Sequence, residues 1–290
     1  MTYTPEDSAK LSLECIKILG DLQTLMGECV RQGEPDPGKR AQEYMLHGVG
    51  RRVKVLHRSL ENIFQLFPPS QERPLKPEDL ADVQINLHAF MINLYGIFEN
   101  WAWAFIYRHR LESEIGSWNN VGLFKKRTQS FLPSVLKDYL QSKSAANWQK
   151  KYLKNYRDAL AHRIPLYVPP ATFTPEEGDR YNKLTEEQFQ CIETRNWDGL
   201  QDMKIKQENV GRPCFEFLHA FSKEEGAGSL ALHTQLLCDS MLIIEFGNMF
   251  CAEWHKRAYP SDPVNRGWRF RVRSILKAMS RRLKSWESRL

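Results

Sequence analysis

The sequence predicts an all-α fold, and three observations support this prediction. Apolar residues recur at helical spacing over long stretches, prolines and glycines fall where those stretches end, and no run alternates between apolar and polar residues long enough to form a convincing strand. Hydrophobic residues make up 42% of the 290 positions, which is enough to bury a core. We therefore expect a compact helical body rather than a disordered chain.

Residues 1–70 are expected to form an N-terminal helical pair. The first helix should begin at Pro5, and its apolar face should continue to about Val30. The second should span about residues 39–67, because two prolines follow it. The apolar face expected for the first helix consists of Leu11, Leu13, Ile16, Ile18, Leu19, Leu22 and Leu25.

Residues 78–260 are expected to form the main helical domain. Its helices follow from their apolar periodicity, and loops rich in glycine or proline separate them. Residues 166–228 are expected to form an irregular insertion with one or two short helices, because prolines, glycines and mixed charges replace the helical apolar periodicity there. The helices predicted for the domain span about residues 77–111, 134–141, 145–163 and 230–256.

The helix at 77–111 carries apolar side chains around almost its whole circumference. This is typical of a helix buried in a bundle or at a dimer seam, and we favour it over a nucleobase-stacking platform, whose rings must be exposed. Glu99 is the exception, since a carboxylate on so apolar a helix is costly unless it is paired. We expect Glu99 to support the motif described next, through a salt bridge or hydrogen bond to a motif residue or to a dimer mate.

Residues 155–165 contain the side chains best suited to chemistry. Arg157 offers a planar fork of donors that fits a phosphate, and His162 can transfer a proton near neutral pH, a pair that suffices for RNA transesterification without a metal. Asp158 could orient either of them. The proline at the end of the segment predicts that the helix stops at about Arg163, which leaves His162 in the last turn. The alternative is an ion pair at a helix end without a catalytic role.

Arg157, Asp158 and His162 resemble the shared motif of the HEPN superfamily, an arginine usually followed by Asn, Asp or His, with a histidine four to six residues after the arginine. The likeness covers roughly residues 78–259 and includes the aromatic stretch 98–103. It implies an all-helical domain that dimerises so that two motifs face one cleft. In many members it also implies a metal-independent endoribonuclease that acts as a toxin or in phage defence, whereas some members are catalytically silent and only bind.

The chain departs from part of the family at one position. Some members carry, two residues after the histidine, a tyrosine to which an antitoxin adds AMP. Ile164 stands at that position here, and Tyr167 is misplaced. That mode of silencing is not expected, although the resemblance leaves room for a neutralising or regulatory protein partner.

The C-terminal segment, residues 261–290, is expected to form a basic amphipathic helix. Nine cations and a single glutamate lie between Arg266 and Leu290, and apolar residues recur there at near-helical spacing. The segment could dock on the protein, bind the RNA backbone, or contact an anionic membrane surface or a partner helix. The residues expected to bind RNA are Lys125, Lys126, Arg127, Lys150, Lys151, Lys154, Arg269, Arg271, Arg273, Arg281 and Arg282.

Other classes of protein lack support in the sequence. The net charge of +6 favours anionic partners only weakly. We find no phosphate-binding glycine loop, zinc-protease motif or redox motif, and the histidines form no helical metal-ligand pair, so no cofactor and no metal are expected. The first residues are polar and do not predict a signal peptide, and Asn93, Glu99 and Asn100 interrupt the apolar stretch 88–107. We expect a cytoplasmic homodimer with RNA as its partner, and membrane binding is not expected.

Overall fold

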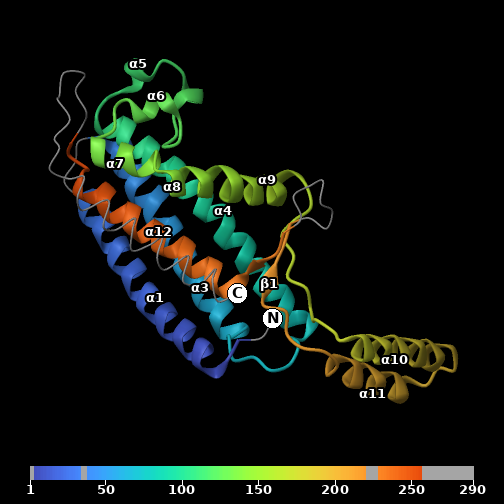
Figure 1. The fold of residues 1–290 in the computed structure, drawn as a ribbon. Helices are drawn as coiled ribbons and strands as arrows, with labels where there is room; N and C mark the ends of the chain where they lie inside the picture. Colours follow the sequence, from blue (N-terminus) through green and yellow to red (C-terminus); the bar gives the residue numbers. More distant parts are fainter. Residues whose placement is uncertain (1–2, 34–37, 220–227, 257–290) are drawn as a thin grey trace. The chain divides into compact units, whose positions relative to one another are not determined.

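The computed structural model describes residues 3–33, 38–219 and 228–256, and over these residues the protein is mostly helical (Figure 1). The exceptions are two short strands, β1 (Glu216–Phe217) and β2 (Leu230–Ala231), which pair antiparallel. The prediction of a predominantly α-helical protein is therefore confirmed. Within the part of the chain that the structure describes, no helix combines the length and apolar character that a membrane crossing needs. The predicted basic helix at 261–290 lies outside the described residues.

The described residues divide into two compact units that interleave along the sequence. Helices α1 (Pro5–Gly33), α4 (Pro77–Arg108) and α12 (Leu232–Ala252) contribute residues to both. Because of this interleaving, the domain limits expected from the sequence stay a prediction. The first unit contains residues 3–27, 51–96, 153–219 and 228–244, and the second contains residues 28–33, 38–50, 97–152 and 245–256.

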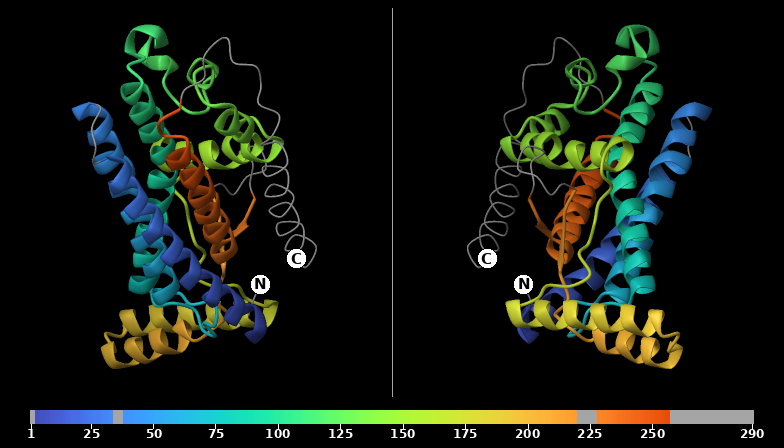
Figure 2. Two further views of the ribbon diagram at one scale, coloured as in Figure 1. Left: turned by 90° about the vertical axis from the view of Figure 1, so that its left-hand side faces the viewer. Right: turned by 90° about the vertical axis from the view of Figure 1, so that its right-hand side faces the viewer.

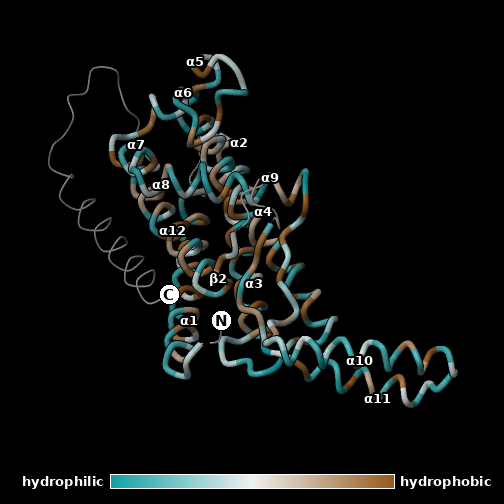
Figure 3. The backbone as a smooth tube through the Cα atoms, turned by 45° about the vertical axis from the view of Figure 1, so that its right-hand side comes forward, coloured by the Kyte–Doolittle hydropathy of each residue, from teal (hydrophilic) through white to brown (hydrophobic). Residues whose placement is uncertain are grey.

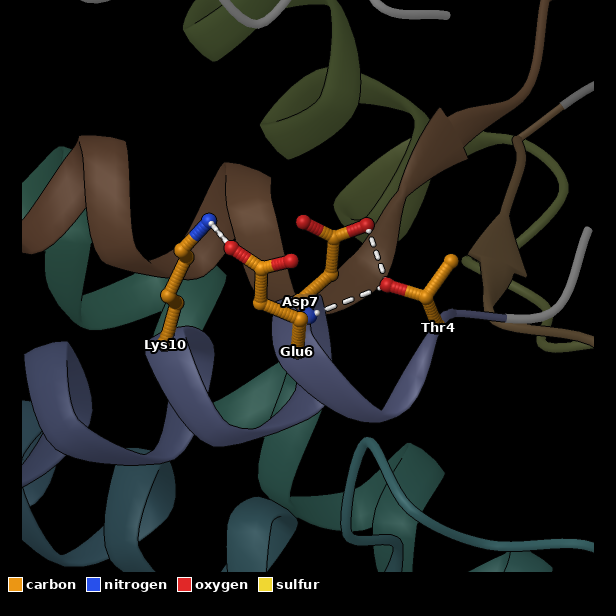
Figure 4. Close-up of polar contacts among 4 residues, drawn as sticks. All are labelled: Thr4, Glu6, Asp7 and Lys10. Carbon is orange, nitrogen blue, oxygen red and sulfur yellow. Dashed lines mark hydrogen bonds and ion pairs between the residues drawn. The ribbon is translucent and has the colours of Figure 1, made fainter.

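Helix α1 begins with a side-chain cap (Figure 4). The hydroxyl of Thr4 accepts a hydrogen bond from the backbone N–H of Asp7 at 3.1 Å and donates one to the Asp7 carboxylate at 2.9 Å. This satisfies one of the backbone donors left open at a helix start. One turn further, Lys10 and Glu6 form an exposed ion pair at 2.6 Å, at the spacing that favours such pairs on a helix.

The buried face of α1 is narrower than the sequence predicted. Its buried residues in the first unit follow steps of four and three, which is the spacing of a single stripe along a helix. Leu13 and Ile16 were expected on this face, but each is 68% exposed, because two residues beyond Leu11 the helix has turned by about 200°. The buried stripe consists of Ser8, Leu11, Cys15, Ile18, Leu22 and Leu25.

The other helices of the first unit are α3 (Arg51–Leu66), α9 (Lys154–His162), α10 (Pro175–Glu193) and α11 (Trp197–Glu208). Helices α10 and α11 lie side by side as a hairpin, which Figure 2 shows from two sides. A capping box between Thr174 and Glu177 starts α10. The stretch 166–228 was expected to be an irregular insertion with one or two short helices; the structure has two helices there, but at 19 and 12 residues they are longer than expected.

The second unit contains short helices around an aromatic core. They are α2 (Lys39–Glu43), η1 (Tyr44–Gly50), α5 (Glu112–Ile115), η2 (Trp118–Asn120), α6 (Lys126–Gln129), α7 (Ser134–Leu140), α8 (Lys143–Asn147) and most of η3 (Trp148–Leu153). In the core, the ring of Phe246 lies 5.4 Å from Phe98 and 5.1 Å from Trp101, measured between centroids. Trp101 and Phe105 are buried, so the prediction that the aromatic helix serves mainly as core is confirmed for them.

Two segments, η1 and η3, are π-helical rather than α-helical. The sequence predicted single helices at 39–67 and 145–163, and in the structure each run is helical but contains one such wider turn. Wide turns of this kind are rare and frequently occur at functional sites. The second of them, η3, ends at the residue before α9, which carries the predicted motif.

Candidate functional site

Helix α9 is fixed in the first unit by Tyr156, the residue before Arg157. The Tyr156 ring packs edge-on against Phe217 and His219, with centroids 5.5 and 4.5 Å away. Its hydroxyl donates a hydrogen bond to the carbonyl of Gly228 at 3.3 Å, and burial raises the pKa of this hydroxyl to about 12. Core packing therefore sets where the motif begins.

Arg157 lies against helix α4. Its Cζ atom is 4.0 Å from the centroid of the Tyr95 ring, which is a cation–π contact, and its Nη1 is 3.1 Å from Oδ1 of Asp158. The side chain remains 25% exposed. Its Nε–H is buried, and it has no hydrogen-bond partner among the residues that the structure describes. The guanidinium is thus held over the Tyr95 ring while the side chain stays partly exposed, as recognition of a phosphate requires.

His162 is the last residue of α9 and is exposed. The helix stops there because Arg163 leaves the helical conformation, with φ −133° and ψ −136°, as the sequence predicted from the following proline. Arg163 then folds back and donates hydrogen bonds to the backbone and side-chain oxygens of Asn155 at 3.2 and 3.3 Å. The imidazole is left at the surface, where it can meet a substrate.

The three motif residues do not all lie on the same face of α9. His162 follows Asp158 by one turn and lies on the same face of the helix. Arg157 and His162, five residues apart, are separated by about 140° around the helix axis and about 7.5 Å along it. One α9 helix by itself does not aim both side chains at a single point.

The segment that leaves α9 is also held in place. His88 of α4 forms a hydrogen bond of 2.8 Å between its Nε2 and the carbonyl of Leu166, and the backbone N–H of Val168 donates to Gln84 at 3.4 Å. Tyr167 pairs with Leu218 through two backbone hydrogen bonds of 2.9 and 3.0 Å. The end of the motif helix is therefore anchored to α4 and to a neighbouring extended segment.

A second arginine meets α4 directly beside Tyr95. Arg52 of α3 donates a hydrogen bond to the side chain of Asn93 at 3.1 Å, and burial lowers the pKa of its guanidinium. Its guanidinium occupies the space that a Cβ on Gly96 would fill. Sequence reasoning missed both Tyr95 and Arg52. The isolated glycine inside an apolar helix was the available signal, since such a glycine often marks a close approach.

Glu99, which was expected to support the motif, belongs to the second unit, whereas Arg157 belongs to the first. Its side chain is half-buried, and its carboxylate oxygens would lie 3.4 and 3.5 Å from a Cβ added to Gly122. The role proposed for Glu99 at the motif stays a prediction. Glu245 presents a similar buried carboxylate and accepts a hydrogen bond from the Tyr139 hydroxyl at 3.0 Å.

The cations expected to bind RNA are exposed wherever the structure describes them. Lys125, Lys126 and Arg127 surround the start of α6, and Arg127 also donates to the backbone of Glu114 and lies 4.8 Å from the Phe131 ring centroid. Lys150 and Lys151 are exposed on η3, and Lys154 is exposed at the first position of α9. Five further candidates lie outside the described residues: Arg269, Arg271, Arg273, Arg281 and Arg282.

Residues 3–33, 38–219 and 228–256 contain no group of three or more His, Cys, Asp or Glu side chains that could hold a metal ion. The chain was also compared with known proteins. No protein-family model, curated protein or solved structure matches it.

Proposed function

We propose that the protein is a metal-independent endoribonuclease of the HEPN type, a toxin or phage-defence effector that cleaves RNA by transesterification. The observation that supports this most is the state of Arg157. Its guanidinium lies over the Tyr95 ring and pairs with Asp158, and the side chain remains a quarter exposed. A pre-oriented planar donor of this kind fits a phosphate oxygen pair.

In the proposed reaction, the 2′-oxygen of a ribose attacks the adjacent phosphorus, and the bond from phosphorus to the 5′-oxygen breaks. His162 accepts the proton of the 2′-hydroxyl or protonates the leaving 5′-oxygen. Arg157 stabilises the charge that develops on the phosphate oxygens. Asp158, one turn before His162, orients the imidazole. The products are a 2′,3′-cyclic phosphate and a 5′-hydroxyl.

We further propose that the active form is a homodimer with a shared site. A single α9 separates Arg157 and His162 by about 140° around its axis, so two copies of the helix facing each other would supply an arginine and a histidine to the same phosphate. The resemblance to the HEPN superfamily implies the same arrangement.

The test is cleavage of single-stranded RNA by the purified protein in EDTA, with analysis of the product ends. Arg157→Ala and His162→Ala should each lower the rate on the order of a hundredfold or more. Arg163→Ala is the matched control, since this arginine is exposed and contacts Asn155, and it should retain the rate. Cleavage that disappears with EDTA, or that survives both motif substitutions, would refute the mechanism.

A mixing experiment tests the shared site. Combining inactive Arg157→Ala and His162→Ala chains should restore part of the activity, because a mixed dimer retains one arginine and one histidine. Light scattering at micromolar concentration should show a dimer. A fully active monomer would exclude sharing.

The alternative function is a catalytically silent module that binds RNA or a protein. The ion pair of 3.1 Å between Arg157 and Asp158 favours it, because this pair offsets the arginine charge without any substrate. Retained RNA binding, with no cleavage and no effect of His162→Ala, would support this alternative over the nuclease.

A further inference from the structure

The hairpin formed by α10 and α11 has almost no core of its own. Its helices are joined by polar contacts in which Gln207 donates to the Thr185 hydroxyl at 2.6 Å and to the Tyr181 carbonyl at 3.1 Å. Gln188 donates in turn to Gln207 at 2.9 Å. Leu184 is the one buried side chain among the residues of the two helices, all of which are described. Apolar side chains on the hairpin are therefore exposed to solvent.

Three large apolar side chains are exposed around the turn of this hairpin. Phe189 is 62% exposed, Ile192 is 46% exposed, and Trp197 is 61% exposed. We call these three residues the hairpin tip. Single exposed apolar residues are normal on a protein surface, but three within nine positions beside one turn form a patch of the kind that binds a partner. Figure 3 shows that the hairpin is largely hydrophilic, with a few hydrophobic positions along it.

The charge of the hairpin restricts the partner. Residues 175–208 carry nine acidic and five basic side chains, a net charge of −4, whereas the whole chain carries +6. This charge repels a phosphate backbone, and it also disfavours pairing of the hairpin with the same hairpin of a second copy. The suitable partner is a basic segment that brings apolar side chains of its own.

The chain contains a segment with these properties. Residues 266–290 carry nine cations and one glutamate, and their apolar residues recur at the spacing of one helix face. These residues lie outside the described part of the structure. Their sequence complements the hairpin in both charge and apolar character. The apolar residues are Trp268, Val272, Ile275, Leu276, Met279, Leu283 and Trp286.

We propose that the acidic α10–α11 hairpin is the docking surface for the basic C-terminal segment 266–290, with the apolar face of the segment covering the hairpin tip. The cations of the segment then lie among the exposed carboxylates near the tip, which include Glu186, Glu193 and Asp198. Charge complementarity brings the two surfaces together, and burial of Phe189 and Trp197 holds them.

The proposal can be tested on the full chain with a carbodiimide, which joins a carboxylate directly to a lysine amine. Lys277 and Lys284 of the segment should couple mainly to carboxylates of residues 175–208. Mixing unlabelled chains with ¹⁵N-labelled chains, and reading the masses of the joined peptides, distinguishes docking within one chain from docking between two copies. Either result agrees with the proposal. Salt near 0.5 M should reduce the yield, because it screens the charges.

Substitution of the hairpin-tip residues is a second test of the proposal. Trp197→Ser and Phe189→Ser should each lower the yield of these cross-links about tenfold, the scale of a central apolar anchor. Trp118→Ser is the matched control, since Trp118 is 53% exposed in η2, outside the hairpin, and this variant should retain the yield. Unchanged helicity by circular dichroism shows that the hairpin remains folded.

Several results would overturn the proposal. The lysines of the segment could couple evenly to carboxylates elsewhere on the protein, or their coupling to the hairpin could be insensitive to Trp197→Ser. Self-association that persists without residues 266–290 and disappears on Trp197→Ser would show instead that the tip binds a second copy of the folded part.

Discussion

The guanidinium of Arg157 lies 4.0 Å over the ring of Tyr95, so a residue of α4 sets the orientation of the side chain proposed to bind the scissile phosphate. The same guanidinium pairs with Asp158, and the Arg157 side chain remains 25% exposed. In terms of the proposed mechanism, Tyr95 is a positioning residue that acts through Arg157.

Replacing Tyr95 should distinguish orientation of the Arg157 guanidinium from binding of the RNA substrate. Tyr95→Ala removes the ring and frees the guanidinium, so kcat for RNA cleavage should fall about tenfold while KM changes little, because the lost interaction matters most in the transition state. Tyr95→Phe retains the aromatic face and should restore most of kcat. Steady-state kinetics of the two variants check this. Equal losses of kcat in Tyr95→Ala and Tyr95→Phe would show that the Tyr95 hydroxyl, and not its ring, positions Arg157.

The sequence predicted the helices of the first unit well where a single periodic stripe faces the core. In α3, Val53, Leu56, Leu60 and Ile63 follow the helical spacing and are all buried. It failed for Leu13 and Ile16, because leucine and isoleucine on both sides of α1 look alike in sequence, and only packing decides which side is covered. The π turns were also not predictable, since periodicity does not distinguish a locally wider helix.

For the candidate site, the end of α9 followed from chemistry that is local in sequence. Pro165 restricts Ile164, the residue before it, which predicted a helix end at about Arg163; the helix ends at His162, which lies in the last turn. The contact between Arg157 and Tyr95 joins residues 62 positions apart, and no local rule connects them. The length of α10 was missed because its many polar residues hide a stable helix that a capping box begins.

The core of the first unit contains a histidine that should make stability depend on pH. His233 is fully buried among Tyr3, Phe64, Phe67 and Phe215, and its Nε2 lies 2.6 Å from the Phe67 carbonyl oxygen. Burial lowers the pKa of His233 to about 4 from an ordinary value of 6.5. The unfolded chain therefore binds the proton more readily than the folded chain. The associated stability is complete above pH 6.5 and is lost as the pH falls toward 4.

This loss should amount to about 3.5 kcal/mol at most, on the basis of about 1.4 kcal/mol for each unit of pKa difference. Denaturant unfolding between pH 7 and pH 4 measures it. In His233→Gln, the amide can still donate to the Phe67 carbonyl but does not titrate, so the variant should lose less stability over this pH range. Parallel pH curves for the two proteins would show that other groups cause the acid sensitivity.

Residues 266–290 are proposed both to bind RNA and to dock on the hairpin. Because the nine cations of this segment release counterions when they neutralise phosphates, its removal should weaken RNA binding and flatten the dependence of log Kd on log salt. Cleavage at saturating RNA should persist, since Arg157 and His162 remain. A lower melting temperature with an unchanged salt slope would instead make the segment purely structural.

If the hairpin holds the segment in the free protein, RNA must displace it. Trp197→Ser should then tighten RNA binding severalfold in the full chain and have no effect once residues 266–290 are removed, a non-additivity that marks two coupled sites. Trp118→Ser should not show this pattern. Fluorescence anisotropy with a labelled single-stranded RNA, measured across a salt series for the single and combined variants, gives all of these values. Tighter binding by Trp197→Ser that remains in the truncated chain would mean that the hairpin acts on RNA directly, simply by its own negative charge, and not through the segment.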